Sequence, residues 1–94
     1  MAVHNLPSVV LAATAAPLSP TSIRANWVQV QGSALTGTAR VGDSTVSSTK
    51  GAILSQTGDS QFFPPLGNAN AYDLSSIYVL GTASDTLAVT YNTN

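Results

Sequence analysis

The sequence predicts an all-β protein, an antiparallel β-sandwich or jelly roll of about seven to eight short strands. Short β-prone segments recur at intervals of about 8–12 residues, with Gly, Asp and Pro residues between them. Residues that favour surface helices are scarce, because the chain has no Glu and only three Lys and Arg residues. A parallel sheet would need crossover helices, and no segment has a pattern that predicts one.

Each predicted strand is a short run rich in β-branched or aromatic residues that ends at turn residues. In chain order, the predicted strands are residues 8–14, 21–30, 38–41, 51–56, 60–63, 74–80 and 86–91, with Val46 in a further short rung. Turns are expected at residues 42–44, 57–59 and 82–85, and a loop at residues 67–70. The Pro64–Pro65 step ends the strand at residues 60–63.

The core is expected to draw on two of these strands. Residues 21–30 have no clearly polar face, which predicts burial on both sides. Trp27 in this strand is expected to anchor the sandwich core. In the last strand Leu87, Val89 and Tyr91 alternate with other residues, so they are expected to share one face.

The domain organisation is expected to have two parts. Residues 1–20 contain three of the five prolines, which favours an extended N-terminal arm or edge strand, since proline cannot donate to a sheet. Residues 21–94 are expected to form the β-sandwich domain. An extended arm can add a strand to the sheet of a neighbouring subunit, so we expect removal of residues 1–19 to weaken attachment to that neighbour more than it harms the fold.

Charged residues make up only 7% of the chain, against about a quarter in average domains. They are Arg24, Arg40, Lys50, Asp43, Asp59, Asp73 and Asp85. A net charge of −1 provides no basic face, so we expect no nucleic-acid partner. No apolar run is long enough for a membrane helix, so we expect no membrane partner. The low charge suits a subunit covered by neighbours; the alternative is a neutral soluble domain.

No catalytic or metal-binding constellation is recognisable. The only histidine, His4, lies close to the start of the chain, a poor place to hold a catalytic base. The chain has no cysteine, which excludes disulfides and cysteine zinc sites. Each aspartate is assigned to a turn or strand start, with a paired-carboxylate site or a calcium site at Asp43 or Asp59 as the less favoured alternative. We therefore predict no enzyme, no catalytic residues, no metal and no cofactor.

Two segments are candidates for contact with other subunits. Phe62 and Phe63 must point to opposite faces if they are extended, and an outward Phe beside two prolines could anchor an interface. A small cluster within one chain is the alternative for these rings. The candidate interface residues are His4, Leu6, Pro7, Phe63, Pro64 and Pro65.

From residue 40 onward, the order of strands and turns resembles a known group of proteins. The pattern runs through RVGD at residues 40–43, GAIL at 51–54, YDLSSIYV at 72–79 and DTLAVTY at 85–91. It is similar to small β-sandwich modules of tailed-phage virions, especially capsid decoration (cement) proteins. The resemblance covers roughly residues 23–91 and is a pattern of strands and turns rather than a catalytic fingerprint.

The resemblance implies a virion structural protein that decorates and stabilises the capsid shell. Such proteins commonly form homotrimers over local three-fold positions on the capsid exterior, so the implied partners are the major capsid protein and further copies of the chain. One alternative is a phage head-fibre, neck or tail adaptor domain. Another is a carbohydrate-binding, adhesin-like module with Trp27 or Tyr72 as a sugar platform.

Overall fold

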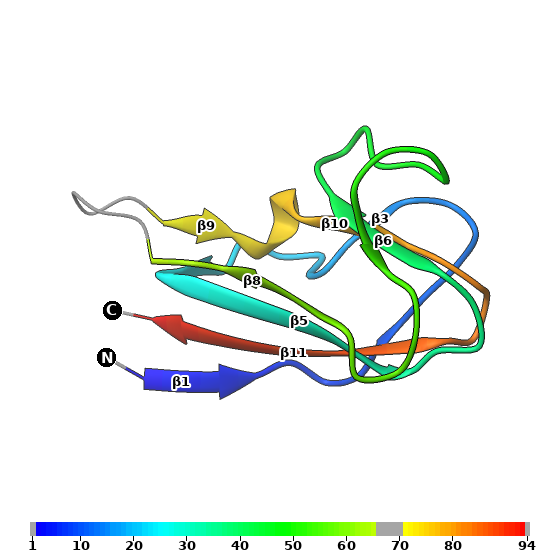
Figure 1. The fold of residues 1–94 in the computed structure, drawn as a ribbon. Helices are drawn as coiled ribbons and strands as arrows, with labels where there is room; N and C mark the ends of the chain where they lie inside the picture. Colours follow the sequence, from blue (N-terminus) through cyan, green and yellow to red (C-terminus); the bar gives the residue numbers. More distant parts are fainter. Residues whose placement is uncertain (1, 66–70, 94) are drawn as a thin grey trace.

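The chain folds as the antiparallel β-sandwich that the sequence predicts (Figure 1). The computed structural model describes residues 2–65 and 71–93, so the loop predicted at residues 67–70 lies outside the described residues. Two antiparallel sheets pack face to face, accompanied by a ribbon of β4 (Arg24–Ala25) and β9 (Tyr72–Asp73). The described residues form eleven strands, because a four-residue strand at Ala2–Asn5 and several two-residue strands occur in addition to the predicted ones.

The two sheets are named here after their central strands. The β5 sheet has the order β1-β11-β5-β8, and β2 also pairs with β11. Its strands are β1 (Ala2–Asn5), β2 (Val9–Val10), β5 (Trp27–Ala34), β8 (Ser60–Phe63) and β11 (Thr86–Thr93). The β6 sheet has the order β3-β10-β6-β7. Its strands are β3 (Ala16–Pro17), β6 (Ala39–Gly42), β7 (Ala52–Leu54) and β10 (Tyr78–Leu80).

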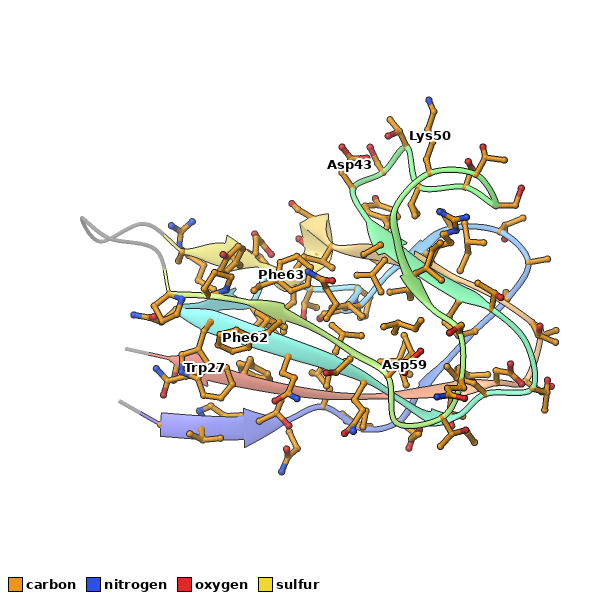
Figure 2. All side chains as sticks on the ribbon, viewed as in Figure 1. Trp27, Asp43, Lys50, Asp59, Phe62 and Phe63 are labelled. Carbon is orange, nitrogen blue, oxygen red and sulfur yellow. The ribbon has the colours of Figure 1, made fainter. Side chains whose placement is uncertain are left out.

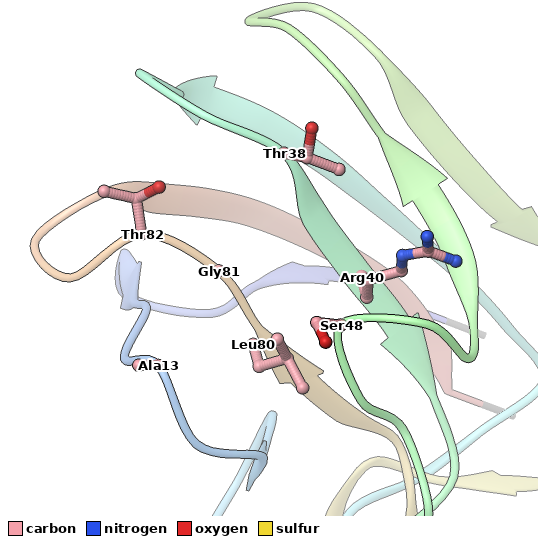
Figure 3. Close-up of a pocket in the computed structure, with 7 residues that line it drawn as sticks. All are labelled: Ala13, Thr38, Arg40, Ser48, Leu80, Gly81 and Thr82. Atoms are coloured by element: carbon pink, nitrogen blue, oxygen red, sulfur yellow. The ribbon is translucent and has the colours of Figure 1, made fainter.

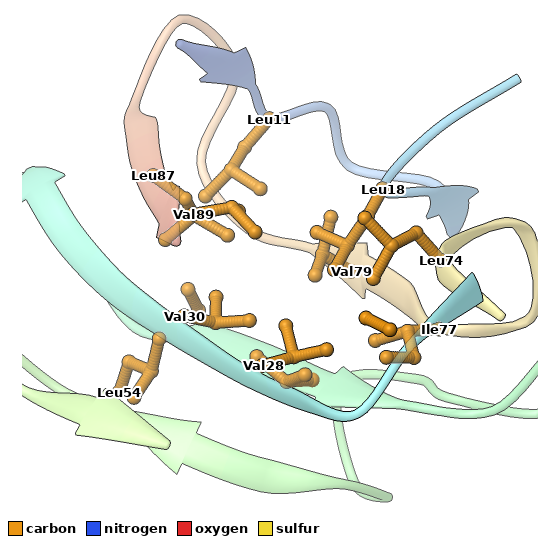
Figure 4. Close-up of a cluster of buried hydrophobic side chains, with 13 residues drawn as sticks. Leu11, Leu18, Val28, Val30, Leu54, Leu74, Ile77, Val79, Leu87 and Val89 are labelled. Carbon is orange, nitrogen blue, oxygen red and sulfur yellow. The ribbon is translucent and has the colours of Figure 1, made fainter. Parts of the chain in front are cut away.

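The core lies between the two sheets and is filled with aliphatic side chains (Figure 4). Val28 and Val30 of β5, and Leu87 and Val89 of β11, are each at most 1% exposed. Side chains alternate between the two faces of a strand, so these four point from the β5 sheet toward the β6 sheet. The shared face predicted for Leu87 and Val89 is therefore confirmed.

Trp27 does not anchor this core, and that expectation was wrong. Val28 is fully buried, so its neighbour Trp27 points to the outer side of the β5 sheet, where it is half-buried. The predicted strand at residues 21–30 is also divided at Asn26, because β4 pairs with β9 whereas β5 pairs with β11. Ala25 and Val28 are both buried although they are three residues apart, so the alternation of faces restarts at this break.

The strand predicted at residues 74–80 is also shorter than expected. Leu74–Ser76 forms a 3-10 helix, and only β10 continues as a strand. Asp73 caps this helix, since its Oδ1 accepts from the Ser75 amide at 3.0 Å and from the Ser75 hydroxyl at 2.7 Å. Such local side-chain bonds offer the backbone an alternative to the sheet, and the apolar pattern of the segment did not reveal them.

The N-terminal segment is built into both sheets. β1 and β2 pair with β11, while β3 pairs with β10. Leu11 and Leu18 of the same segment are 3% and 5% exposed and belong to the core cluster. Deleting the segment would therefore remove core side chains. The N-terminal segment is therefore part of the sandwich, and its removal should harm the fold directly.

We predict that Leu11→Ala will lower the free energy of unfolding by about 2–5 kcal/mol, because it opens a cavity in the core. The matched control is Val10→Ala, because Val10 is 66% exposed, and its change should stay within about 0.5 kcal/mol. Chemical denaturation of both variants measures the difference. Equal stability of the two variants would show that the segment is not part of the cooperative fold.

Candidate interaction surfaces

Asp43, Asp59 and Asp73 hold local turns, as the sequence predicted, whereas Asp85 binds a distant segment. Asp43 accepts from the amide and hydroxyl of Thr45, and Asp59 accepts from the amide and hydroxyl of Ser55. Asp73 caps the 3-10 helix and also accepts from the Ser22 hydroxyl at 2.6 Å. These bonds favour the ionised form, and the Ser22 hydroxyl is the main cause that lowers the pKa of Asp73 to about 2.

Asp85 connects more distant parts of the chain and is 4% exposed. Its carboxylate accepts from the amide and the hydroxyl of Thr36, each at 2.8 Å, and from the Gly37 amide at 3.3 Å. Its own carbonyl accepts from the Leu11 amide at 2.8 Å. The Thr36 amide lowers the pKa of Asp85 below its ordinary value, although burial opposes this shift. Asp85 thus joins the segment after β5 to the N-terminal segment.

The described parts of the chain contain no group of three or more His, Cys, Asp or Glu side chains that could hold a metal ion. His4 stacks on Tyr91, with ring centroids 5.2 Å apart, and its Nε2 lies 3.2 Å from the Thr93 hydroxyl. The hydroxyls of Ser22 and Thr36 donate to the carboxylates of Asp73 and Asp85, so these contacts hold the fold together. Within the same residues, no helix has the length and hydropathy needed to cross a membrane.

The six predicted interface residues do not form one surface. His4 lies in β1 and Leu6 and Pro7 follow it, so these three lie at one edge of the β5 sheet. Phe63 lies in β8 at the opposite edge, and Pro64 and Pro65 follow it. Strands β11 and β5 separate the two groups. The structure therefore offers two separate candidate areas.

Leu6 and Pro7 line an uncharged groove beside the N-terminal segment. The groove has a volume of about 320 Å³. Its lining residues are Leu6, Pro7, Ser8, Val9, Leu18, Ser19 and Pro20. Leu6 is half-buried and Pro7 is exposed, so the groove offers apolar surface that the other residues described in the structure leave open. One wall follows β1 and the other follows β3, which places the groove at the side of the sandwich.

The outward ring of the aromatic pair is Phe62 rather than the predicted Phe63. Phe63 turns inward, packs against the core and meets Tyr72 edge-on at 5.5 Å. Phe62 is 48% exposed and lies against Trp27, with ring centroids 5.8 Å apart (Figure 2). The prediction that the two rings separate was correct. The assignment of the outward one was wrong because nothing in the sequence fixed the register of β8.

Phe62 and Trp27 belong to a larger outer surface of the β5 sheet, which we call the neutral face. Cross-strand partners share a face, and the registers align Val3 with Asn92 and Trp27, and Thr90 with Gln29 and Phe62. The outward residues that define the neutral face are Val3, Asn5, Val10, Trp27, Gln29, Gln31, Ser60, Phe62, Ala88, Thr90 and Asn92. None of them is charged.

The aromatic rings of this face do not form the flat row that a sugar platform requires. The planes of Trp27 and Phe62 are inclined by 48°. Tyr72, the other candidate platform, packs against Phe63 and donates its hydroxyl to the Pro64 carbonyl at 2.7 Å. The geometry thus gives no support to the carbohydrate-binding alternative.

A second hollow, of about 300 Å³, lies on the outer side of the β6 sheet (Figure 3). Arg40 is the only charged residue among those that line it. Its guanidinium Nη1 donates to the Gly51 carbonyl at 3.0 Å and, in Figure 3, points away from Ala13 and Thr82. The other polar side chains of the hollow are the hydroxyls of Thr38, Ser48 and Thr82, which provide no acid–base pair.

Sequence reasoning found the groove through Leu6 and Pro7 but missed the neutral face. The alternation Trp27, Gln29, Gln31 contained the signal, since it groups an aromatic residue with two uncharged polar ones. It was read as one side of a doubly buried strand. Comparison of the chain with protein-family models, with curated proteins and with solved structures found no match in any of the three.

We predict that the protein loses stability as the pH falls through the aspartate pKa values. These pKa values lie below the ordinary value of 3.8 in the folded protein. The stabilisation by the ionised aspartates is complete above the unfolded pKa of about 3.9 and is lost at lower pH. The melting temperature should therefore fall mainly between about pH 4 and pH 2.

The Asp85→Asn variant tests the carboxylate that joins segments far apart in the sequence. We expect a lower melting temperature at pH 7 and a flatter decline between about pH 4 and pH 2, because the variant lacks the ionised acceptor. Asp43→Asn is the control, since its carboxylate serves a single exposed turn. If both variants melt like the wild type at every pH, the Asp85 network does not stabilise the fold.

Proposed function

We propose that the chain is a virion structural protein that decorates a capsid shell from its exterior and stabilises it. In this proposal it binds the major capsid protein as a homotrimer at local three-fold positions. The observation that carries the proposal is the uncharged groove with Leu6 and Pro7, because it presents apolar surface where the sequence predicted contact with another subunit. The sandwich fold and the resemblance over residues 23–91 give further support.

The groove has the properties of a surface for protein attachment rather than for chemistry. Its walls carry Pro7, Val9, Leu18 and Pro20, and its polar residues are two serines. Burying such surface against a partner releases water and costs no charge desolvation. A trimer would offer three grooves at once, so modest single contacts would add up through multivalency.

A mechanical role follows from this arrangement. Each trimer would hold neighbouring capsid subunits together, so many copies would raise the resistance of the shell to internal pressure. Attachment through uncharged surface should also depend little on salt, because there are few ion pairs to screen. No step of this mechanism requires a catalytic residue, a metal or a cofactor.

We predict that Pro7→Asp will weaken attachment to shells assembled from the major capsid protein of the same genome by at least about tenfold, since it places a charge in the apolar contact. Co-sedimentation of the chain with these shells measures the affinity, and electron microscopy of the particles locates it. Ala83→Asp adds the same charge to an exposed loop residue and should bind like the wild type.

Thermal melts confirm that both variants are folded. Failure of the wild-type chain to bind shells would overturn the proposed function. Density at the neck or tail instead of over the shell would replace it with the adaptor role. Wild-type binding by Pro7→Asp would show that another surface makes the attachment.

A further inference from the structure

We propose that the neutral face is a self-association surface, on which the chain packs against further copies of itself. The inference rests on the proposed homotrimer and identifies the surface that forms it. Its three grounds are the clustering of exposed apolar side chains, the absence of charge, and the area of the face.

Exposed apolar side chains gather on this face. The large hydrophobic residues that stand exposed in the described chain are Val3 at 62%, Val10 at 66%, Ile53 at 55% and Phe62 at 48%. Three of these four lie on the neutral face, and only Ile53 lies on the β6 sheet. Isolated exposed hydrophobic residues are ordinary, whereas their concentration on one face is typical of an interaction site.

Val3, Trp27 and Phe62 give the face an apolar end, where Trp27 begins β5. The Trp27 and Phe62 rings are in contact, with centroids 5.8 Å apart, and Figure 2 shows them side by side across the sheet. Asn92 pairs with both Val3 and Trp27 and is only 2% exposed, so its neighbours form the surface at this point. Aromatic anchors of this kind contribute a large share of the energy of protein interfaces.

Absence of charge makes the face compatible with a second copy of itself. Closed symmetry brings equivalent surface patches together, so a charged residue close to the axis would meet the same charge on its neighbour. The charged residues lie elsewhere, and Figure 2 shows Asp43 and Lys50 in the loop beyond β6 and Asp59 at the turn before β8. His4 stacks on Tyr91, and Tyr91 packs against the core cluster. Both residues therefore lie on the core side of the β5 sheet and not on the neutral face.

The area of the face fits a weak contact. Strands lie about 4.8 Å apart and rise about 3.4 Å per residue, so β5 and β11 with eight residues each and β1 and β8 with four each give a face of about 400 Å². Three copies around one axis would bury about 1,200 Å² together, or about 400 Å² for each pair of copies, which is the size of a weak interface. We therefore expect an oligomer that dissociates on dilution. The groove lies at the side of the sandwich, so it stays open in the oligomer.

The test compares three single substitutions by light scattering over a wide range of protein concentration. Phe62→Asp and Val3→Asp place a charge on the neutral face, and Ile53→Asp places one at an equally exposed apolar position on the other sheet. We expect the wild type and Ile53→Asp to reach three times the monomer mass. The two face variants should need at least about tenfold higher concentration to associate.

Thermal melts show whether each variant is folded. If Phe62→Asp does not fold, Val3→Asp takes its place as the test of the neutral face. Two results would overturn the inference: a wild-type chain that stays monomeric at all concentrations, or face variants that associate like Ile53→Asp. Shell binding separates this inference from the proposed function. If the chain stays monomeric but still binds shells, the inference is overturned and the proposed function stands, even if Phe62→Asp abolishes that binding. If the chain forms a trimer through the neutral face but does not bind shells, the inference stands and the proposed function is overturned.

Discussion

Pairing between β11 and β5 is the constraint on which the rest of the structure depends. Their register runs from Thr86 opposite Ala34 to Asn92 opposite Trp27, and β11 also holds β1 and β2 on its other side. The register turns Val28 and Leu87 into the core, so it also turns Trp27 outward. The hydrophobic core and the neutral face are therefore two results of the same pairing, and a shift by one residue would exchange them.

Parts of this fold with local signals could be predicted from the sequence. β8 was predicted with its correct bounds because Thr57–Asp59 forms a turn on one side and two prolines follow on the other. The outward orientation of Trp27 follows instead from the pairing of β5 with β11, in which Trp27 lies opposite Asn92. Sequence spacing does not show which face of a strand such pairing turns inward, so the sequence named Leu6 and Pro7 without their groove and left the alternation of Trp27, Gln29 and Gln31 unrecognised as an outer face.

Scarcity of charge has a structural counterpart in the turns. All four carboxylates accept bonds from amides or hydroxyls within the chain, and Asp85 holds segments that lie far apart in the sequence. The carboxylates of the protein are thus committed to its own architecture. The groove and the neutral face are uncharged, which directs recognition there toward shape and apolar burial rather than toward ion pairs.

The position of β1 has a consequence for the order in which the protein is made. β1 pairs residue by residue with the last strand, from Ala2 opposite Thr93 to Asn5 opposite Thr90. During synthesis β1 has no partner until β11 has left the ribosome. The β5 sheet can therefore be completed only after Thr86–Thr93 has been translated. Contacts between residues so far apart in the sequence slow folding, because a very large loop must be closed before they can form. Until then β1 remains an unpaired edge that other nascent chains could reach.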